Sequence, residues 1–234
     1  RKRLCVLLPA TGATPKQVGR ARATADTWAR PYLFGAPESA QGRTIALLYS
    51  RRPLLPGWED ATLSLVGDVD LRHPKFNALR FLYLWLVIIR YHAGDCDFFM
   101  KGDMDAYVNV PALLRALGPA NASERLYVGK VTLSHGPGYT RWEPFAHGLG
   151  YVLSRGALRA SGAVVAQCLE HLVRHRLEAI EDMTLASCLR GAAVRPVDFP
   201  AAGGPVVFDF RGARDVDRVL ALPEPALLVH PVEP

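Results

Sequence analysis

The stretch DFFMKGDMD at residues 97–105 decides the fold that this sequence predicts. Residues 97–101, with the apolar Phe98-Phe99-Met100 at their centre, are typical of a central strand, and a glycine then opens a turn that carries Asp103 and Asp105. In open α/β sheets, ligands bind at the edge where the strands end. The stretch therefore predicts a strand that delivers two carboxylates to a ligand-binding edge.

Short apolar runs and longer helical stretches alternate on both sides of this strand. Strands are expected at residues 4–8, 44–49, 62–66, 126–130 and 149–154, and helices at 14–29, 74–92, 155–176 and 181–189. Residues 208–210 and 227–230 are expected to be strands or ordered loops. Because such alternation is typical of an α/β sandwich, we predict one globular domain over residues 1–234.

The charge of the chain favours a small anionic ligand over nucleic acid. The formal net charge is +6, and of the 28 basic residues five are Lys and 23 are Arg, spread over all 234 residues. A surface for nucleic acid would gather basic residues on one face and interleave them with aromatic side chains, and no such stretch occurs. We therefore expect no nucleic-acid partner.

The longest apolar run, residues 81–89, is too short to cross a membrane. It holds nine residues between two arginines, whereas a spanning helix needs roughly 20. The sequence starts without Met and leads directly into an apolar strand, so we expect an excised domain whose membrane anchor lies outside this chain.

The cysteines and one sequon favour the secretory pathway. The four cysteines show none of the paired short spacings of a zinc site. Their even number and the acceptor sequon Asn121-Ala122-Ser123 both fit an oxidising lumen. We expect a glycoprotein of a secretory-pathway lumen.

Asp103 and Asp105 have the chemistry of a site for a divalent cation. Two carboxylates at positions i and i+2 of one turn can hold a hard cation against a diphosphate, and oxygen ligands suit Mg²⁺ or Mn²⁺. The tripeptide alone is also common in ordinary surface turns, so its context decides.

That context resembles glycosyltransferase family 31, which includes β-1,3-galactosyltransferases, β-1,3-N-acetylglucosaminyltransferases, core-1 synthase and Fringe. The apolar strand with its lysine, the turn and the Pro-started helix after Asn109 are similar to the donor motif of the family. Further segments fit the family in the same order: RARATADTW at 20–28, GD at 67–68, FNAL at 76–79, PFAHGLGYVLS at 144–154, IEDMTLASCL at 180–189 and LVHP at 228–231. The resemblance spans nearly the whole chain.

The resemblance implies a fold of the nucleotide-sugar transferase (GT-A) type, a three-layer sandwich around a mostly parallel central sheet. It implies Mn²⁺ bound by Asp105 and His230, with Asp103 positioning the metal and the nucleotide. The residues implied to contact the donor nucleotide are Asp103, Met104, Asp105, Arg22 and Lys101.

The acceptor side is implied by the two later motifs. Asp182 is expected to be the general base that takes the proton of the acceptor hydroxyl, and Glu181 stays open as an alternative base. The residues implied to contact the acceptor are Glu181, Gly148, His147 and Trp142.

The resemblance implies an inverting, metal-dependent enzyme that transfers a sugar from a uridine-diphosphate donor to a glycan, glycopeptide or phosphoglycan hydroxyl. Galactose in a β-1,3 linkage is the expected sugar. Met104 stands where the family usually has a third acidic residue, which keeps UDP-N-acetylglucosamine or an arabinose donor open as alternatives, and also a catalytically inactive sugar-nucleotide-binding domain. Ala146 replaces a cysteine found in many members, and a bridge between Cys168 and Cys188 is a hypothesis.

Overall fold

A computed structural model describes residues 2–9, 15–29, 32, 44–50, 62–64, 77–103, 105–134, 143–175, 180–199, 206–208 and 228–230. The chain divides into two compact units. The first unit comprises Arg1–Val66, Met100–Ala120 and Phe199–Pro234, and the second comprises Gly67–Phe99 and Asn121–Asp198. The single domain expected from the sequence stays a prediction.

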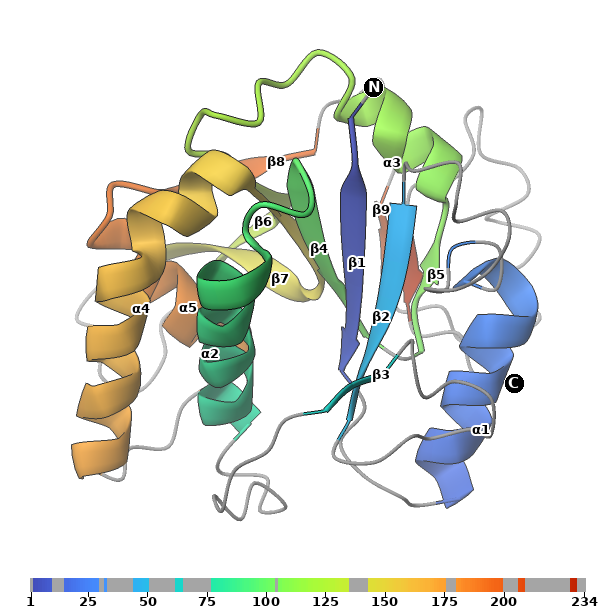
Figure 1. Ribbon diagram of the computed structural model, residues 1–234, viewed down its shortest axis with the longest axis horizontal. Coiled ribbons are helices and arrows are strands. Elements are labelled where there is room, and N and C mark those ends of the chain that lie inside the picture. The colour runs from blue at the N-terminus through green and yellow to red at the C-terminus, as the bar shows by residue number, and fades with distance from the viewer. Residues whose placement is uncertain are drawn as a thin grey trace. The chain divides into compact units, whose positions relative to one another are not determined.

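The first unit contains short strands in the order β3 (Thr62–Ser64), β2 (Thr44–Ser50), β1 (Leu4–Pro9) and β4 (Phe98–Gly102). The first two residues of β4 belong to the second unit. The pairs β1–β2 and β2–β3 are parallel. Every residue of 4–8 is at most 3% exposed, which explains the unbroken apolar run of this strand. The strands predicted at 4–8 and 44–49 are confirmed, each with one further residue, while 65–66 lie outside the described residues (Figure 1).

The helix predicted at 14–29 is present in two parts. α1 (Pro15–Thr24) begins at a proline, which suits the first helical turn, and Thr14 lies outside the described residues. The wider π-helical turn η1 (Ala25–Ala29) follows directly and buries Trp28 and Ala29. Single π-helical turns of this kind are frequent at functional sites.

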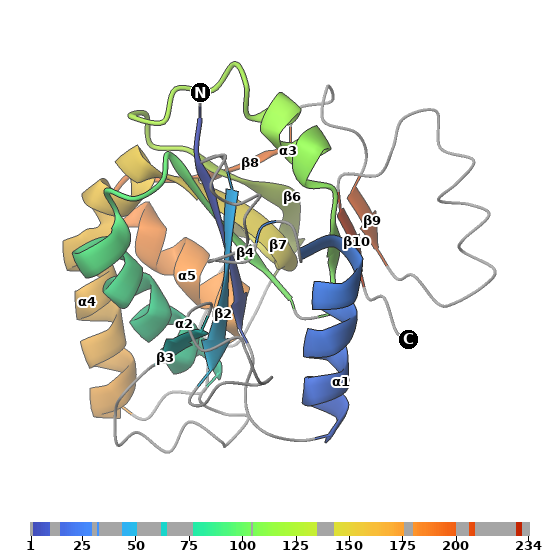
Figure 2. The same ribbon diagram turned by 45° about the vertical axis from the view of Figure 1, so that its right-hand side comes forward.

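A second, three-stranded sheet completes the first unit. β10 (Leu228–His230) pairs antiparallel with β5 (Tyr107–Val108) and parallel with β9 (Val206–Phe208), as Figure 2 shows. α3 (Val110–Ala116) follows β5, and the side chain of Asn109 caps it by accepting a bond of 3.1 Å from the Ala112 amide.

The second unit has strands in the order β4, β7 (Glu143–Ser154), β6 (Tyr127–Ser134) and β8 (Pro196–Asp198). β6 pairs antiparallel with β7 and parallel with β8, so the sheet is mixed. The strand predicted at 149–154 is six residues too short at its start, because residues 143–148, with a proline and a glycine, show no strand pattern. Pairing with β6 makes residues 143–146 extended nonetheless.

Three helices of the second unit pack together beside β7: α2 (Asn77–Val87), α4 (Arg155–His175) and α5 (Glu181–Arg190) (Figure 1). The π-helical turn η5 (Ile88–His92) continues α2, so the helix predicted at 74–92 is confirmed from residue 77 onward. The middle of this helix is apolar but not buried on all faces, because Tyr83 is 37% exposed. In the described part of the chain, no helix is both long and apolar enough to cross a membrane.

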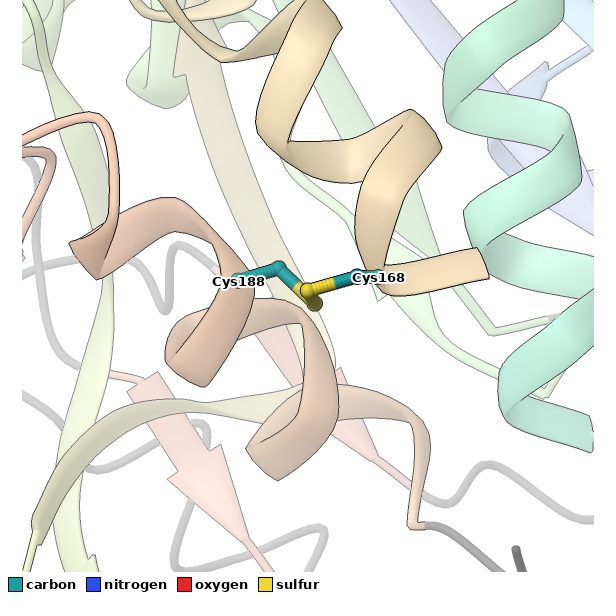
Figure 3. Close-up of a disulfide and its surroundings, with 2 residues drawn as sticks. All are labelled: Cys168 and Cys188. Atoms are coloured by element: carbon teal, nitrogen blue, oxygen red, sulfur yellow. A yellow bond between two sulfur atoms is a disulfide. The ribbon is translucent and has the colours of Figure 1, made fainter. Parts of the chain in front are cut away.

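A disulfide between Cys168 and Cys188 joins α4 to α5 (Figure 3). The two Cα atoms lie 6.0 Å apart, an ordinary distance for a disulfide. This confirms the bridge that the sequence raised as a hypothesis. It fixes the helix whose first turn carries Glu181 and Asp182 to the longest helix of the second unit.

Ser154, the last residue of β7, is a buried junction between strand and helix. Its hydroxyl oxygen accepts bonds of 3.0 Å from the amides of Ala157 and Leu126, and its hydroxyl donates to the Glu124 carbonyl. The first of these bonds caps α4. The serine that ends the family-like segment GYVLS therefore has a structural role.

Replacing Ser154 with Ala should lower the free energy of unfolding by about 2 kcal/mol, since it removes a helix cap and leaves the buried Ala157 amide without this partner. Ser161 is a matched control, because it is equally buried but only donates to the Ala157 carbonyl within its own helix. Ser161→Ala should lower it by less than about 1 kcal/mol. Urea unfolding of both variants measures the difference, and equal losses would contradict the assigned cap.

Removing the disulfide with the double substitution Cys168→Ala and Cys188→Ala should lower the free energy of unfolding by about 3 kcal/mol, as expected for a closed loop of this length. The sequence separation of the two residues is 20. Chemical unfolding of oxidised protein and of the double variant gives the value. Non-reducing peptide mapping that finds the two cysteines unlinked would refute the bridge itself.

Candidate active site

A four-residue excursion of β7 forms the centre of the acceptor-side motif. Gly129 of β6 pairs with Tyr151, and Val131 pairs with Ala146, so one residue of β6 faces residues 147–150 of β7. The strands approach closely at the base of this excursion. A Cβ atom on Gly129 would lie 2.6 Å from the Cβ of Ala146, so only glycine fits there.

The excursion turns a backbone amide toward Asp182. The Gly148 amide donates a bond of 2.7 Å to Oδ2 of Asp182, and the Met183 amide donates one of 2.8 Å to Oδ1. Asp182 is 8% exposed and lies in the first turn of α5, where the positive end of the helix dipole favours a negative charge. The carboxylate is therefore held in one orientation.

Glu181 lies beside Asp182 and is held from the interior. The Tyr151 hydroxyl donates a bond of 2.6 Å to Oε1 of Glu181, and Nε1 of Trp85 donates one of 3.0 Å to the Tyr151 oxygen. Trp85 and Tyr151 are both fully buried. A hydrogen-bonded chain thus runs from the core of the second unit to one carboxylate of the candidate site.

Both carboxylates converge on Gly148. A Cβ atom on this residue would lie 3.2 Å from Oδ2 of Asp182 and 3.4 Å from Oε2 of Glu181. Any side chain would have to push the Asp182 carboxylate aside. Gly148, expected to contact the acceptor, therefore also makes room for the two acidic groups.

Burial raises the pKa of the Tyr151 phenol well above its ordinary value of 10.0, and the charge of Glu181 raises it further. Burial followed by the charge of Glu181 has the same effect on the pKa of Tyr127, which lies edge-on to Tyr151 with ring centroids 5.5 Å apart. Both phenols therefore stay protonated at any working pH. Tyr151 remains a hydrogen-bond donor to Glu181.

In the first unit, the turn that carries the two aspartates is held by cations. Nζ of the buried Lys101 lies 2.6 Å from Oδ1 of Asp103, and Nη1 of Arg20 lies 3.0 Å from Oδ2 of Asp105. Nε1 of Trp28 donates a bond of 2.9 Å to the Ala106 carbonyl. α1 and η1 therefore clamp the turn from outside the sheet.

The strand that carries His230 lies beside the same turn. Val229 of β10 pairs with Tyr107 of β5, and the two strands are antiparallel. His230 therefore lies opposite Ala106, the residue that follows Asp105. This placement concerns the backbone only, because the His230 side chain lies outside the described residues.

The donor set of the turn fits a hard divalent cation. Two carboxylate groups and a strand ending in histidine offer oxygen and imidazole ligands, which suit manganese. Within the described ranges, no group of three or more His, Cys, Asp or Glu side chains is placed to hold a metal ion. Manganese therefore remains a proposal.

The predicted site residues fall into two groups. The first unit brings together Asp103, Asp105, Lys101 and the strand of His230, and the second brings together Gly148, Glu181 and Asp182, with His147 next in the chain. Arg22, expected to contact the nucleotide, is exposed. Met104 and Trp142 lie outside the described residues.

Sequence reasoning missed four residues that hold these groups: Arg20, Trp28, Trp85 and Tyr151. A helical wheel would have found the first of them, because residues 20, 24 and 28 follow one another at intervals of four, whereas residue 22 points elsewhere. Thr24 and Trp28 are 5% and 6% exposed, as that interval predicts. No local pattern marks Tyr151 as a partner of Glu181, which lies 30 residues away.

Arg20→Gln should loosen the turn after Asp105. Because a partly exposed ion pair contributes up to about 1 kcal/mol, we expect amide exchange at residues 106–108 to become about threefold faster. Arg22→Gln is the matched control on the exposed side of the same helix and should leave exchange unchanged. Hydrogen–deuterium exchange measures both, and identical profiles would contradict the clamp.

Two solved structures share the fold of this chain. One is a glycosyltransferase involved in the glycosylation of the major capsid of PBCV-1, with a TM-score of 0.53 and 13% identity over 97% of this chain and 92% of that chain. The other is galactosyltransferase LgtC in complex with donor and acceptor sugar analogs, with a TM-score of 0.50 and 12% identity over 98% and 87%. The chain has the α/β fold of GT-A glycosyltransferases, as predicted.

Curated relatives give a narrower result, although no protein-family model matches the chain. Human N-acetyllactosaminide β-1,3-N-acetylglucosaminyltransferase 4 is 28% identical over 82% of this chain and 53% of its own length. Mouse UDP-GlcNAc:βGal β-1,3-N-acetylglucosaminyltransferase 8 is 25% identical over 97% and 59%, and its human counterpart 26% over 83% and 51%. The chain spans little more than half the length of these relatives. The chain fits glycosyltransferase family 31, which confirms the resemblance found in the motifs.

Proposed function

We propose that this chain is the catalytic domain of an inverting glycosyltransferase that moves a sugar from a uridine-diphosphate donor to a glycan hydroxyl. The observation that carries the proposal is the Asp182 carboxylate, which two backbone amides hold at the start of α5. A fixed carboxylate beside a glycine-rich excursion is suited to act as a general base.

In the proposed reaction, Asp182 takes the proton of the acceptor hydroxyl while that oxygen forms a bond to the anomeric carbon. The bond from the anomeric carbon to the diphosphate breaks on the opposite face, and its electron pair leaves with the diphosphate. One displacement inverts the anomeric centre. Each oxygen of Asp182 accepts one amide bond and keeps a second acceptor position for the incoming hydroxyl.

Asp103, Asp105 and His230 would hold the manganese ion of the donor site. A bound divalent cation neutralises negative charge on a departing diphosphate. Lys101 and Arg20 keep the two carboxylates oriented from behind, through ion pairs of 2.6 Å and 3.0 Å. The role of Arg22 at the nucleotide, and those of Met104 and Trp142, stay predictions.

We propose N-acetylglucosamine as the transferred sugar. The preference for galactose drawn from the sequence is not confirmed, because the printed names of the curated relatives specify β-1,3-N-acetylglucosaminyl transfer, two of them to a β-galactoside. This donor was one of the open alternatives, and Met104 in place of an acidic residue is compatible with a change of donor.

We also propose that the domain works in the lumen of the Golgi, tethered by an anchor outside this chain. The Cys168–Cys188 disulfide supports an oxidising compartment. The sequon supports it too, because Asn121 and Ser123 are both exposed in a turn. Glycan, glycopeptide and phosphoglycan acceptors are all compatible with this location.

The test is a transfer assay with a panel of nucleotide sugars on β-galactoside acceptors, with manganese and then with chelator. We expect turnover with UDP-N-acetylglucosamine that is lost on chelation. Turnover with UDP-galactose instead would refute the proposed donor. Donor binding without turnover on any acceptor would favour the inactive sugar-nucleotide-binding domain.

Asp182→Asn should lower kcat by about 10²-fold to 10⁴-fold and leave donor binding unchanged, since the amide cannot take a proton. Asp198→Asn is the matched control, because Asp198 also accepts a backbone amide bond, of 3.0 Å from Val131, outside the site. The control should keep kcat within about twofold. A larger loss in Glu181→Gln than in Asp182→Asn would assign the base to Glu181.

A further inference from the structure

We propose that Trp85 and Tyr151 are positioning residues of the transferase site, which fix the Glu181 carboxylate beside Asp182 through the hydrogen-bonded chain from Trp85 Nε1 to the Tyr151 hydroxyl to Glu181 Oε1. The inference rests on the proposed function for its catalytic consequence. The hydrogen-bonded chain lies entirely within the second unit.

The direction of this chain is set by chemistry. An indole N–H can only donate, so the bond of 3.0 Å from Trp85 must end on the Tyr151 oxygen. The single phenolic proton is then committed to Glu181, across 2.6 Å. A short bond to a carboxylate belongs to the stronger class of hydrogen bonds.

Burial protects the two hydrogen bonds of this chain from competition by water. Trp85 and Tyr151 are both 0% exposed, so no solvent competes for their polar atoms. The pKa of Tyr151 is raised, first by burial and then by the charge of Glu181, so the phenol does not lose its proton at any pH at which the enzyme would work. Glu181 therefore has a constant donor behind it.

The two oxygens of Glu181 consequently differ in role. Oε1 is turned to the core and held by Tyr151, whereas Oε2 lies 3.4 Å from the position that a Cβ on Gly148 would occupy, the same position that Oδ2 of Asp182 approaches to 3.2 Å. A glutamate side chain normally has several rotamers, and fixing it in advance removes that entropy from the binding step.

This arrangement predicts separate tasks for the two acidic residues. Asp182, held by backbone amides, takes the proton. Glu181, held by side chains of the core, offers a pre-set oxygen to a hydroxyl of the acceptor sugar. Loss of the Tyr151 hydroxyl should then weaken acceptor use, whereas donor binding should be unaffected.

Tyr151→Phe is the test, and a second buried tyrosine of the protein provides a matched control. Tyr127 is equally buried and lies against Tyr151, but its hydroxyl contacts the backbone of Ala146 at 3.3–3.4 Å. We expect Tyr151→Phe to lower kcat/KM for the acceptor about tenfold, as for one lost hydrogen bond to a charged group, with KM for the donor unchanged. Tyr127→Phe should change neither by more than about twofold.

A double-mutant cycle with Glu181→Ala, which removes the acceptor of the Tyr151 hydroxyl, separates positioning from general stability. In the Glu181→Ala background, Tyr151→Phe should cause little further loss of kcat/KM for the acceptor, because the residue it positions is already absent. Trp85→Phe should give a smaller loss in the same direction. Equal losses from the two tyrosine variants, or additive losses in the cycle, would overturn the proposal.

A readout without turnover keeps the outcome distinct from that of the proposed function. Thermal unfolding of wild type, Tyr151→Phe, Glu181→Ala and the double variant should show non-additive shifts in Tm, whether or not any sugar is transferred. Non-additive Tm shifts without activity would overturn the proposed function and leave the chain intact. Additive Tm shifts would overturn the chain itself.

Discussion

The bond from the Gly148 amide to Asp182 is the interaction on which the acceptor side of the site depends. It connects β7 to the first turn of α5, and its two residues lie 34 positions apart in the sequence. The bond forms at residues 147–150, where β7 leaves its register with β6. An amide used in the ladder between two strands would not be available to orient Asp182.

Within each unit, the candidate acidic residues have two kinds of support. Backbone amides fix Asp182, whereas side chains from the core fix Glu181. In the first unit, Lys101 supports Asp103 from within β4, whereas Arg20 supports Asp105 from α1. In both units the acidic groups lie at the ends of secondary structure elements, and the side chains that support them lie within helices and strands.

Local patterns were sufficient to predict much of the fold. The apolar run at 4–8, the proline that begins α1 and the acidic start of α5 each determine an element within a few residues. The excursion of β7 was not predictable in this way, since the HGLG sequence at 147–150 is equally compatible with a loop. Its form depends on pairing with β6, which lies elsewhere in the sequence.

The site shows the same division. Asp103, Asp105, Glu181 and Asp182 were identified from motifs, because catalytic groups of this kind occur in short recognisable segments. Trp85 and Tyr151 were not, because a buried hydrogen-bond partner has no signature in its own neighbourhood. The ion pair of Arg20 with Asp105 was not predicted either, because the π-helical turn η1 and the buried Trp28 set which face of the helix meets the turn.

Because β7 is paired with β6 on both sides of the excursion, the length of the excursion does not determine the pairing of the strand. Ala146 and Tyr151 pair with Val131 and Gly129 of β6, and these pairs do not involve residues 147–150. Insertions or deletions there would alter the shape of the acceptor-facing surface without shifting the strand that follows. A change confined to residues 147–150 would thus act on the surroundings of Asp182 and spare the paired parts of β7.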